Sequence, residues 1–207
     1  GTCTTATIFE SILFTSRDVD IIKYLIQNGC TPSVKDLQSK PFLSFRCRTF
    51  RRSLVALILR AVQDEVFNMQ TARTLLSMLE ASGYQLTKDS FCRHLMDIVS
   101  RLSANIHQVN WDDNGDVVLL TSQVDFAMRP FHWSGLWAAL DEDIVTYVNG
   151  LISRMSKPPQ IPSLSSICRM RIRGRLYETQ RVHQLHKFVD QLPLPSVFKR
   201  YLTLEDF

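Results

Sequence analysis

The C-terminal part of the chain carries apolar side chains at a strict spacing of four residues. Leu164, Cys168, Ile172 and Leu176 follow one another at this interval. On an α-helix, residues four apart lie one above another, so the spacing predicts a helix with a single narrow apolar ridge. Such a ridge is typical of a helix that docks in a groove of a partner protein. The small side chain of Cys168 would let the partner approach closely.

Two closely spaced prolines follow this helix. The segment 192–195 reads Leu-Pro-Leu-Pro, and its prolines fix the backbone in an extended conformation with little entropy left to lose on binding. The two leucines are therefore predicted to project as preorganised side chains. We expect an amphipathic helix before the segment, at about 178–190, and a short helix after it, at 196–202. Pro195 suits the first turn of that last helix. The apolar residues that should face inward from the earlier helix are Val182, Leu185, Phe188 and Val189.

A proline-rich segment separates this C-terminal part from the rest of the chain. Residues 157–162 read Lys-Pro-Pro-Gln-Ile-Pro, which cannot continue a helix and favours an extended spacer. Ser163 comes directly afterwards and is a good N-cap for the helix that follows. We therefore divide the chain into a helical domain at 1–156, a linker at 157–162 and a C-terminal module at 163–207.

The ridge and the proline segment, in this order and about twenty residues apart, resemble the SOCS box. The resemblance implies a three-helix module with an elongin C box at 163–172 and a cullin box at about 189–202. The implied elongin C contacts are Leu164, Ile167, Cys168, Ile172 and Leu176. The implied cullin contacts are Leu192, Pro193, Leu194, Pro195, Phe198 and Tyr201.

The preceding residues resemble an ankyrin repeat. Residues 18–33 read DVDIIKYLIQNGCTPS, with a helical apolar stripe that stops at Asn28-Gly29, like the second helix and exit loop of a repeat. A first helix is expected at about 6–16. The later pattern is weaker, because the glycines do not recur at the ankyrin period of about 33 residues. Further helices are predicted at 53–67, 71–81, 90–103 and 143–151, with a hairpin-like segment at 109–120. The fold class is therefore all-α, and an irregular helical domain is the alternative to divergent ankyrin-like repeats.

Together these features are similar to the ankyrin repeat and SOCS box family. The resemblance implies a non-catalytic substrate-recognition subunit of an E3 ubiquitin ligase. Its SOCS box would bind elongin C, with elongin B attached, and cullin-5 with its RING-box protein. The N-terminal domain would hold a protein target. An intracellular scaffold or signalling protein without ligase assembly is the alternative from another class.

Composition agrees with an intracellular protein. The chain has 207 residues, 45% of them hydrophobic, and a formal net charge of +4. Its five cysteines form no CxxC pair, which is typical of reduced thiols in the cytosol or nucleus. No apolar run approaches the roughly 18 residues that a membrane span needs. We expect a cytoplasmic protein, with the nucleus as a second compartment.

Other functional patterns are weaker. Arginines at 169, 171, 173 and 175 alternate with other residues, as in a basic nucleic-acid patch, but on a helix we expect them on the solvent side. His183 and His186 have a metal-binding spacing without a third ligand nearby. The aromatic residues Phe126, Phe131, Trp133 and Trp137 are expected to pack in a core, with a substrate pocket as the alternative. No catalytic residues, cofactor or metal are expected.

Overall fold

The computed structural model describes residues 12, 18–28, 53–104, 110–113, 115–131, 140–157, 162–180 and 185–205. These residues are predominantly helical, which confirms the prediction of an all-α chain. None of the helices in the described ranges is long and apolar enough to cross a membrane. The chain divides into two compact units. The first contains 1–36, 70–85 and 161–207, and the second contains 37–69 and 86–160.

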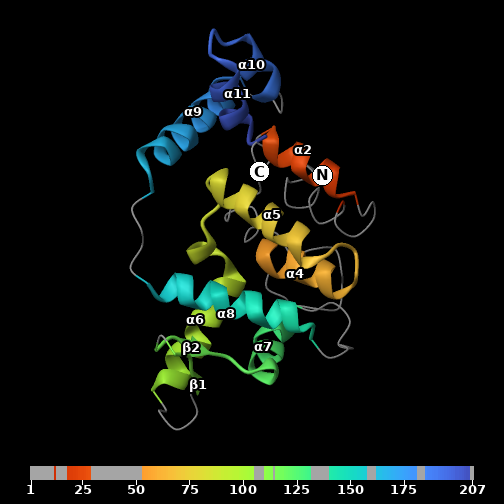
Figure 1. Ribbon diagram of the computed structural model, residues 1–207, viewed down its shortest axis with the longest axis vertical. Helices are drawn as coiled ribbons and strands as arrows, with labels where there is room; N and C mark the ends of the chain where they lie inside the picture. The colour runs from red at the N-terminus through yellow and green to blue at the C-terminus, as the bar shows by residue number, and fades with distance from the viewer. Residues whose placement is uncertain are drawn as a thin grey trace. The chain divides into compact units, whose positions relative to one another are not determined.

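Figure 1 labels the α-helices and strands of both units. The second unit contains α4 (Leu54–Gln63), η1 (Leu86–Lys88), α6 (Ser90–Ser103), β1 (Asn110–Trp111), β2 (Val117–Val118), α7 (Thr121–Met128), η3 (Arg129–Phe131) and α8 (Glu142–Ser156). The first unit contains α2 (Val19–Gln27), nearly all of α5 (Met69–Ala81), α9 (Leu164–Gln180), α10 (Leu185–Gln191) and α11 (Ser196–Thr203).

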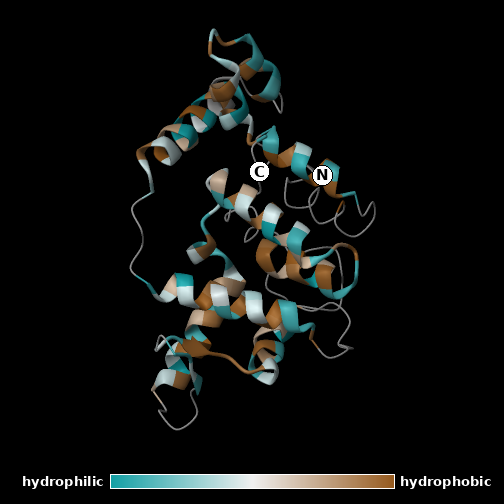
Figure 2. Ribbon diagram, in the orientation of Figure 1, coloured by the Kyte–Doolittle hydropathy of each residue, from teal (hydrophilic) through white to brown (hydrophobic). Residues whose placement is uncertain are grey.

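In the second unit, α4 lies in the core. Most of its side chains are apolar and buried, and Figure 2 shows it mostly brown. A helix that is apolar all round is stable only when it is enclosed by other elements. The neighbouring helices α6 and α8 contact it, and the side chain of Gln63 accepts a 3.1 Å hydrogen bond from the backbone N–H of Asp141 at the start of α8.

Asp89 joins the starts of α4 and α6. Its buried carboxylate accepts hydrogen bonds from the hydroxyl of Ser53 at 2.6 Å, the N–H of Leu54 at 3.2 Å and the N–H of Phe91 at 2.8 Å. The hydroxyl oxygen of Ser53 in turn accepts from the N–H of Ala56 at 3.0 Å. Helix N-termini leave backbone N–H groups without intrahelical partners. A single carboxylate therefore satisfies donors of two helices in the core.

The predicted hairpin lies at the edge of this unit. β1 and β2 pair antiparallel, with Trp111 opposite Val117, and Gly115 in the turn has a φ of 76° that favours glycine. The side-chain amide of Asn149 on α8 then holds the next residue, Leu119, since it accepts from the N–H of Leu119 and donates to its carbonyl oxygen.

α7 follows the hairpin and is an element that the sequence pattern did not predict. Phe131 is buried and meets Phe91 edge to face, as expected of a core aromatic, but Phe126 is exposed. Trp133 and Trp137 lie outside the described residues.

Most predicted helices are present with shifted ends. α2, α5 and α6 agree with the predicted segments, and α8 extends beyond the predicted 143–151. α4 ends at Gln63 rather than near residue 67, because the chain turns at Glu65, whose φ is 55°. The predicted first ankyrin helix at 6–16 lies outside the described residues, except for Ile12. The ankyrin-like character of the domain is not confirmed by this fold.

In the first unit, α9, α10 and α11 pack against one another (Figure 1). Leu185, Val189 and Leu202 are buried together, and Leu176 packs partly buried against them. The sequence predicted one helix at 178–190, whereas the structure ends α9 at Gln180 and begins α10 at Leu185. Leu185 and Val189 face inward as predicted, Phe188 is half-buried, and Val182 lies outside the described residues.

Candidate protein-docking site on the C-terminal helices

The start of α9 is fixed by serine side chains. The hydroxyl oxygen of Ser163 accepts a 3.2 Å hydrogen bond from the backbone N–H of Ser166, and its carbonyl accepts from the N–H of Ile167 at 3.0 Å. Ser163 is therefore the N-cap, as the sequence predicts. The hydroxyl of Ser163 also lies 2.9 Å from that of Ser165. The first turn of α9, which carries Leu164, is thus held by local hydrogen bonds.

One side of α9 exposes apolar residues. We call this the outer face of α9 and define it by Leu164, Ile167, Cys168 and Ile172. Leu164 is 76% exposed and Ile172 is 42% exposed, and Cys168 is an exposed free thiol. Scattered apolar residues are normal on a protein surface, but a continuous row of them marks an interaction site.

The opposite side of α9 buries arginines. We call this the inner face of α9 and define it by Ser166, Arg169, Met170, Arg173 and Leu176. Arg169 is only 7% exposed and Arg173 only 4%. The prediction that these two arginines lie on the solvent side was wrong, because backbone oxygens and an aromatic ring of neighbouring helices surround them. In Figure 2, α9 mixes teal and brown segments along its length.

Arg173 caps two helix C-termini at once. Its guanidinium donates to the carbonyl oxygen of Leu202, in the last turn of α11. It also donates to the carbonyl oxygens of Ile26 at 2.8 Å and Gln27 at 3.4 Å, at the end of α2. Carbonyls at helix C-termini lack intrahelical donors and carry the negative end of the helix dipole, so a cation is well placed there.

Burial, and then the positive charge of Arg169, lower the pKa of Arg173 to about 10. The side chain therefore remains charged at neutral pH. Placing a charged group in a protein interior is costly unless it is hydrogen-bonded, and the three carbonyl oxygens supply those bonds. Arg173 is thus a structural cation within the first unit.

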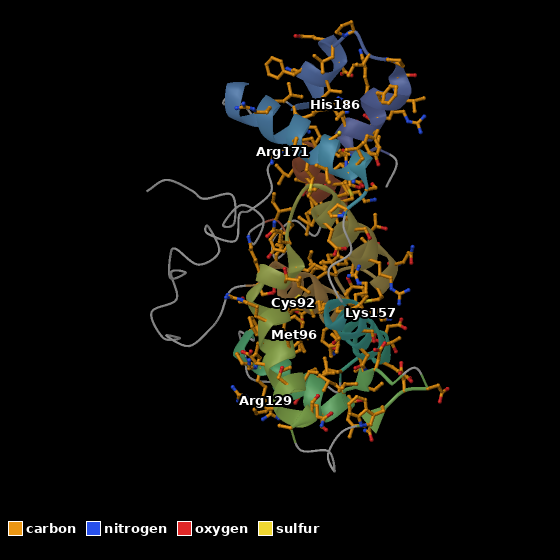
Figure 3. The ribbon with its side chains drawn as sticks, turned by 90° about the vertical axis from the view of Figure 1, so that its left-hand side faces the viewer. Cys92, Met96, Arg129, Lys157, Arg171 and His186 are labelled. Atoms are coloured by element: carbon orange, nitrogen blue, oxygen red, sulfur yellow. The ribbon has the colours of Figure 1, made fainter. Side chains whose placement is uncertain are left out.

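Arg169 stacks on the last helix. Its guanidinium carbon lies 4.5 Å from the ring centroid of Tyr201 on α11, within the range of a cation–π interaction. Tyr201 is half-buried, so this contact is partly shielded from water. The burial of Arg169 and Arg173 also removes two members of the alternating arginine row from the surface. Arg171, which Figure 3 labels on α9, and Arg175 remain exposed. Nothing in this arrangement supports a nucleic-acid surface.

Leu176 has a different environment from the other four predicted elongin C contacts. It is partly buried against Leu185, Val189 and Leu202, whereas the outer face lacks such packing. In this structure its side chain joins α9 to α10 and α11. The spacing of four places Leu176 in the same row as Leu164, but α10 and α11 cover the row at Leu176.

The proline segment is exposed and closely hydrogen-bonded. Pro193, Leu194 and Pro195 are exposed, and Leu192 is half-buried. The N–H of Leu192 donates to the carbonyl of Val189 at 3.1 Å, and the N–H of Leu194 donates to the carbonyl of Leu192 at 2.7 Å. The ammonium of Lys199 donates to the carbonyl of Asp190. These bonds fix the path from α10 to α11.

α11 also exposes apolar side chains. The helix begins at Ser196, as predicted. Pro195, directly before it, is the N-cap, and the carbonyl of Pro195 accepts from the N–H of Phe198 at 3.0 Å. Val197 is 67% exposed and Phe198 is 58% exposed. We call Leu194, Val197 and Phe198 the α11 face. This face includes Leu194 of the proline segment, and two of its residues, Leu194 and Phe198, are predicted cullin contacts.

The end of the described chain folds back on α10. Leu204 is fully buried with a φ of 62°, and this left-handed conformation directs Glu205 toward α10. One ring nitrogen of His186 lies 2.7 Å from the carboxylate of Glu205 and the other 3.3 Å from that of Asp190. Figure 3 labels His186 on α10. Within the described ranges no group of three His, Cys, Asp or Glu residues could hold a metal ion, and His183 lies outside them.

Sequence reasoning missed Val197, Arg169 and Arg173. Val197 is the most exposed apolar residue of α11, and its position beside Pro195 and Phe198 could have indicated it. For the burial of Arg169 and Arg173, the sequence holds only a weak indication: the two are four residues apart, on the side of the helix opposite the ridge.

Residues 160–203 match the family model of the SOCS box. The matched segment includes α9, α10 and α11. No curated protein and no solved structure matches the chain. Ankyrin repeats are not among the family matches, so the ankyrin-like interpretation of residues 1–156 remains a prediction. The SOCS box match supports a substrate-receptor role in an elongin B/C- and cullin-dependent ubiquitin ligase.

Proposed function

We propose that this protein is a substrate-recognition subunit of an elongin B/C–cullin-5 RING ubiquitin ligase. The observation that carries the proposal is the distribution of side chains on α9, which exposes a row of apolar residues and buries two of its four arginines. A helix whose outward side meets only water would expose charged residues and bury apolar ones. The outer face of α9 is therefore suited to a protein partner, and the SOCS box match indicates elongin C.

The outer face fits a groove-binding helix. Leu164 stands near the helix start with most of its surface exposed, and burying such a side chain contributes about 1.5–3 kcal/mol. Cys168 one turn later is small and lets the partner approach, and Ile172 adds a third contact. Ile167 widens the apolar strip. Elongin C would take these four residues, with elongin B attached to it.

The proline segment and the α11 face are suited to cullin-5. Leu194 stands between two prolines on a hydrogen-bonded backbone, so its side chain is held before any partner arrives. Val197 and Phe198 add exposed apolar surface directly after it. The preference for cullin-5 over another cullin is part of the proposal and comes from the resemblance of the Leu-Pro-Leu-Pro segment to a cullin-5 box.

The mechanism would be one of proximity. The helices outside the SOCS box hold a protein target, while the cullin's RING-box protein recruits the ubiquitin-charged E2 enzyme. A lysine of the target then reacts at a high effective concentration. This chain contributes binding and orientation and no reacting group. We place the assembly in the cytoplasm, with the nucleus as a second compartment.

A co-purification experiment tests the proposal. The full chain is expressed with and without elongin B/C, and the complex is titrated with the N-terminal domains of cullin-5 and of cullin-2 in parallel. We expect a stable complex with elongin B/C that binds cullin-5 in preference to cullin-2. Failure to retain elongin B/C would contradict the ligase role and favour a scaffold without ligase assembly. Preference for cullin-2 would contradict only the cullin-5 assignment.

A further inference from the structure

The two proposed docking faces lie on different helices, and buried arginines connect those helices. The outer face belongs to α9, whereas the α11 face consists of Val197 and Phe198 on α11 and of Leu194 just before it. Between them, Arg169 stacks on Tyr201, and Arg173 donates to the carbonyl of Leu202. Both arginines project from the inner face of α9, away from the residues proposed to meet elongin C.

We propose that Arg169 and Arg173 are positioning residues that set the orientation of α11 and thereby control cullin binding. The inference rests on the proposed function and adds residues to it that do not touch either partner. It separates the two sides of α9: the outer face serves elongin C, and the inner face serves the cullin through α11.

The spacing along α11 gives the physical reason. Tyr201 lies four residues after Val197, and Leu202 lies four residues after Phe198, so each pair is stacked along the helix. A contact that holds Tyr201 and Leu202 therefore fixes the rotation of α11 about its axis. That rotation decides the direction in which Val197 and Phe198 point. Without the arginines, α11 would lose the stacking of Arg169 on Tyr201 and the hydrogen bond from Arg173 to the carbonyl of Leu202. The apolar packing of Leu202 that remains against α9 and α10 is less directional than a hydrogen bond.

Arg173 also connects α9 to α2. Its bonds to Ile26 and Gln27 fix the end of α2 to the middle of α9, within the same unit. The side chain thus contacts the C-termini of α2 and α11 from a third helix. Because its guanidinium is planar with donors in a fixed geometry, it holds both carbonyl groups in defined directions. A lysine cannot reproduce this, since its ammonium is a compact charge on a flexible stem.

The experiment uses the full chain bound to elongin B/C, with Arg169→Met and Arg173→Met as variants. Methionine keeps much of the length and apolar volume but removes the charge and the donors. Arg171→Met is the matched control, because it removes the same charge from an exposed position of the same helix. The affinity for elongin B/C and then for the N-terminal domain of cullin-5 is measured by calorimetry. Hydrogen exchange of the α11 amides in the elongin-bound complexes is the second readout.

We expect Arg169→Met to lower cullin-5 affinity by about tenfold or more, with elongin B/C affinity changed by less than about threefold. α11 should exchange faster than in the wild-type complex, and the Arg171→Met complex should exchange like the wild type. Arg169→Lys should recover part of the cullin affinity, because it restores a cation above Tyr201 without the planar group.

Two results would overturn the inference. One is wild-type cullin-5 affinity together with unchanged α11 exchange in both methionine variants. The other is an equal loss of elongin and cullin affinity, which would indicate general unfolding rather than positioning, and Arg169→Lys provides the folded variant in which to check this. If the wild-type complex itself binds no cullin, the proposed function fails at that step. The exchange data then still decide whether the arginines orient α11.

Discussion

The guanidinium of Arg173 donates a 2.8 Å hydrogen bond to the carbonyl oxygen of Ile26, a residue 147 positions earlier in the chain. The bond places the end of α2 against the helix that carries the proposed elongin face. The C-terminal helices are therefore not packed only among themselves. A substitution of Arg173 is therefore expected to affect both segments.

The outer face of α9 should determine elongin binding. Leu164→Ala and Cys168→Phe should each weaken elongin B/C binding by about tenfold or more, since the first removes a side chain that the partner would bury and the second blocks close approach. Isothermal calorimetry on the full chain measures this. Leu120→Ala is a suitable control, because it truncates another strongly exposed leucine in the second unit. Equal affinities for all three variants would contradict the assignment.

Cullin binding should be separable from elongin binding. Replacing residues 192–195 with four alanines leaves the outer face of α9 unaltered, so elongin B/C should still co-purify. Cullin-5 should be lost, because alanine neither fixes the extended backbone nor replaces the exposed leucine side chain at position 194. Titration of the purified complex with the cullin-5 N-terminal domain provides the measurement. Undiminished binding by the alanine variant would refute this role of the segment.

Arg173 should also stabilise the fold. Arg173→Met leaves helix-terminal carbonyls without their donor, and we expect a loss of about 2–4 kcal/mol in the free energy of unfolding. The loss should be the same at pH 6 and pH 9. The pKa of Arg173 is about 10 in the folded protein, lowered from the ordinary value of an arginine, so the side chain is protonated in both states throughout that range.

Chemical denaturation at the two pH values measures this effect. Only above about pH 10 would the native side chain release its proton before the unfolded one, and the wild-type protein would then gain stability from this group as pH rises. Arg171→Met should change stability by no more than about 0.5 kcal/mol, as for other exposed positions. A loss that grew steadily between pH 6 and pH 9 would show that another group is involved.

In the second unit, the carboxylate of Asp89 should be the most sensitive polar position. Asp89→Ala removes the acceptor for Ser53, Leu54 and Phe91, and should lower the free energy of unfolding by about 2–4 kcal/mol. Asp143→Ala, at an exposed position in the first turn of α8, is the control and should cost well under 1 kcal/mol. Elongin binding by the Asp89 variant at low temperature should remain close to that of the wild type, since Asp89 belongs to the other unit.

The sequence predicted the helices well where apolar periodicity or a capping residue defines them. Ser163 caps α9 as predicted, and α6 begins and ends at the predicted residues. α7 was not predicted, because its short apolar pattern depends on packing against α6 and α8. The break between α9 and α10 was misplaced, since the local pattern of residues 178–184 gives little indication of where the helix ends.

For the docking site, the spacing of four identified Leu164, Cys168 and Ile172, which are exposed on α9, but it also included Leu176, which is partly buried against α10 and α11. The positions of Arg169 and Arg173 could not be obtained in the same way. Charged side chains are usually exposed, so periodicity alone assigns them to the solvent side. What buries them is the meeting of the C-termini of α2 and α11 with α9, and this depends on tertiary contacts between distant segments.

The exposed outer face of α9 should limit how much of this protein accumulates in a cell. Before a partner arrives, Leu164, Ile167 and Ile172 present an uncovered apolar strip, a feature that promotes aggregation and attracts chaperones and proteases. Copies that outnumber their partner should therefore be short-lived. The supply of that partner, rather than synthesis of the chain, would then set its abundance.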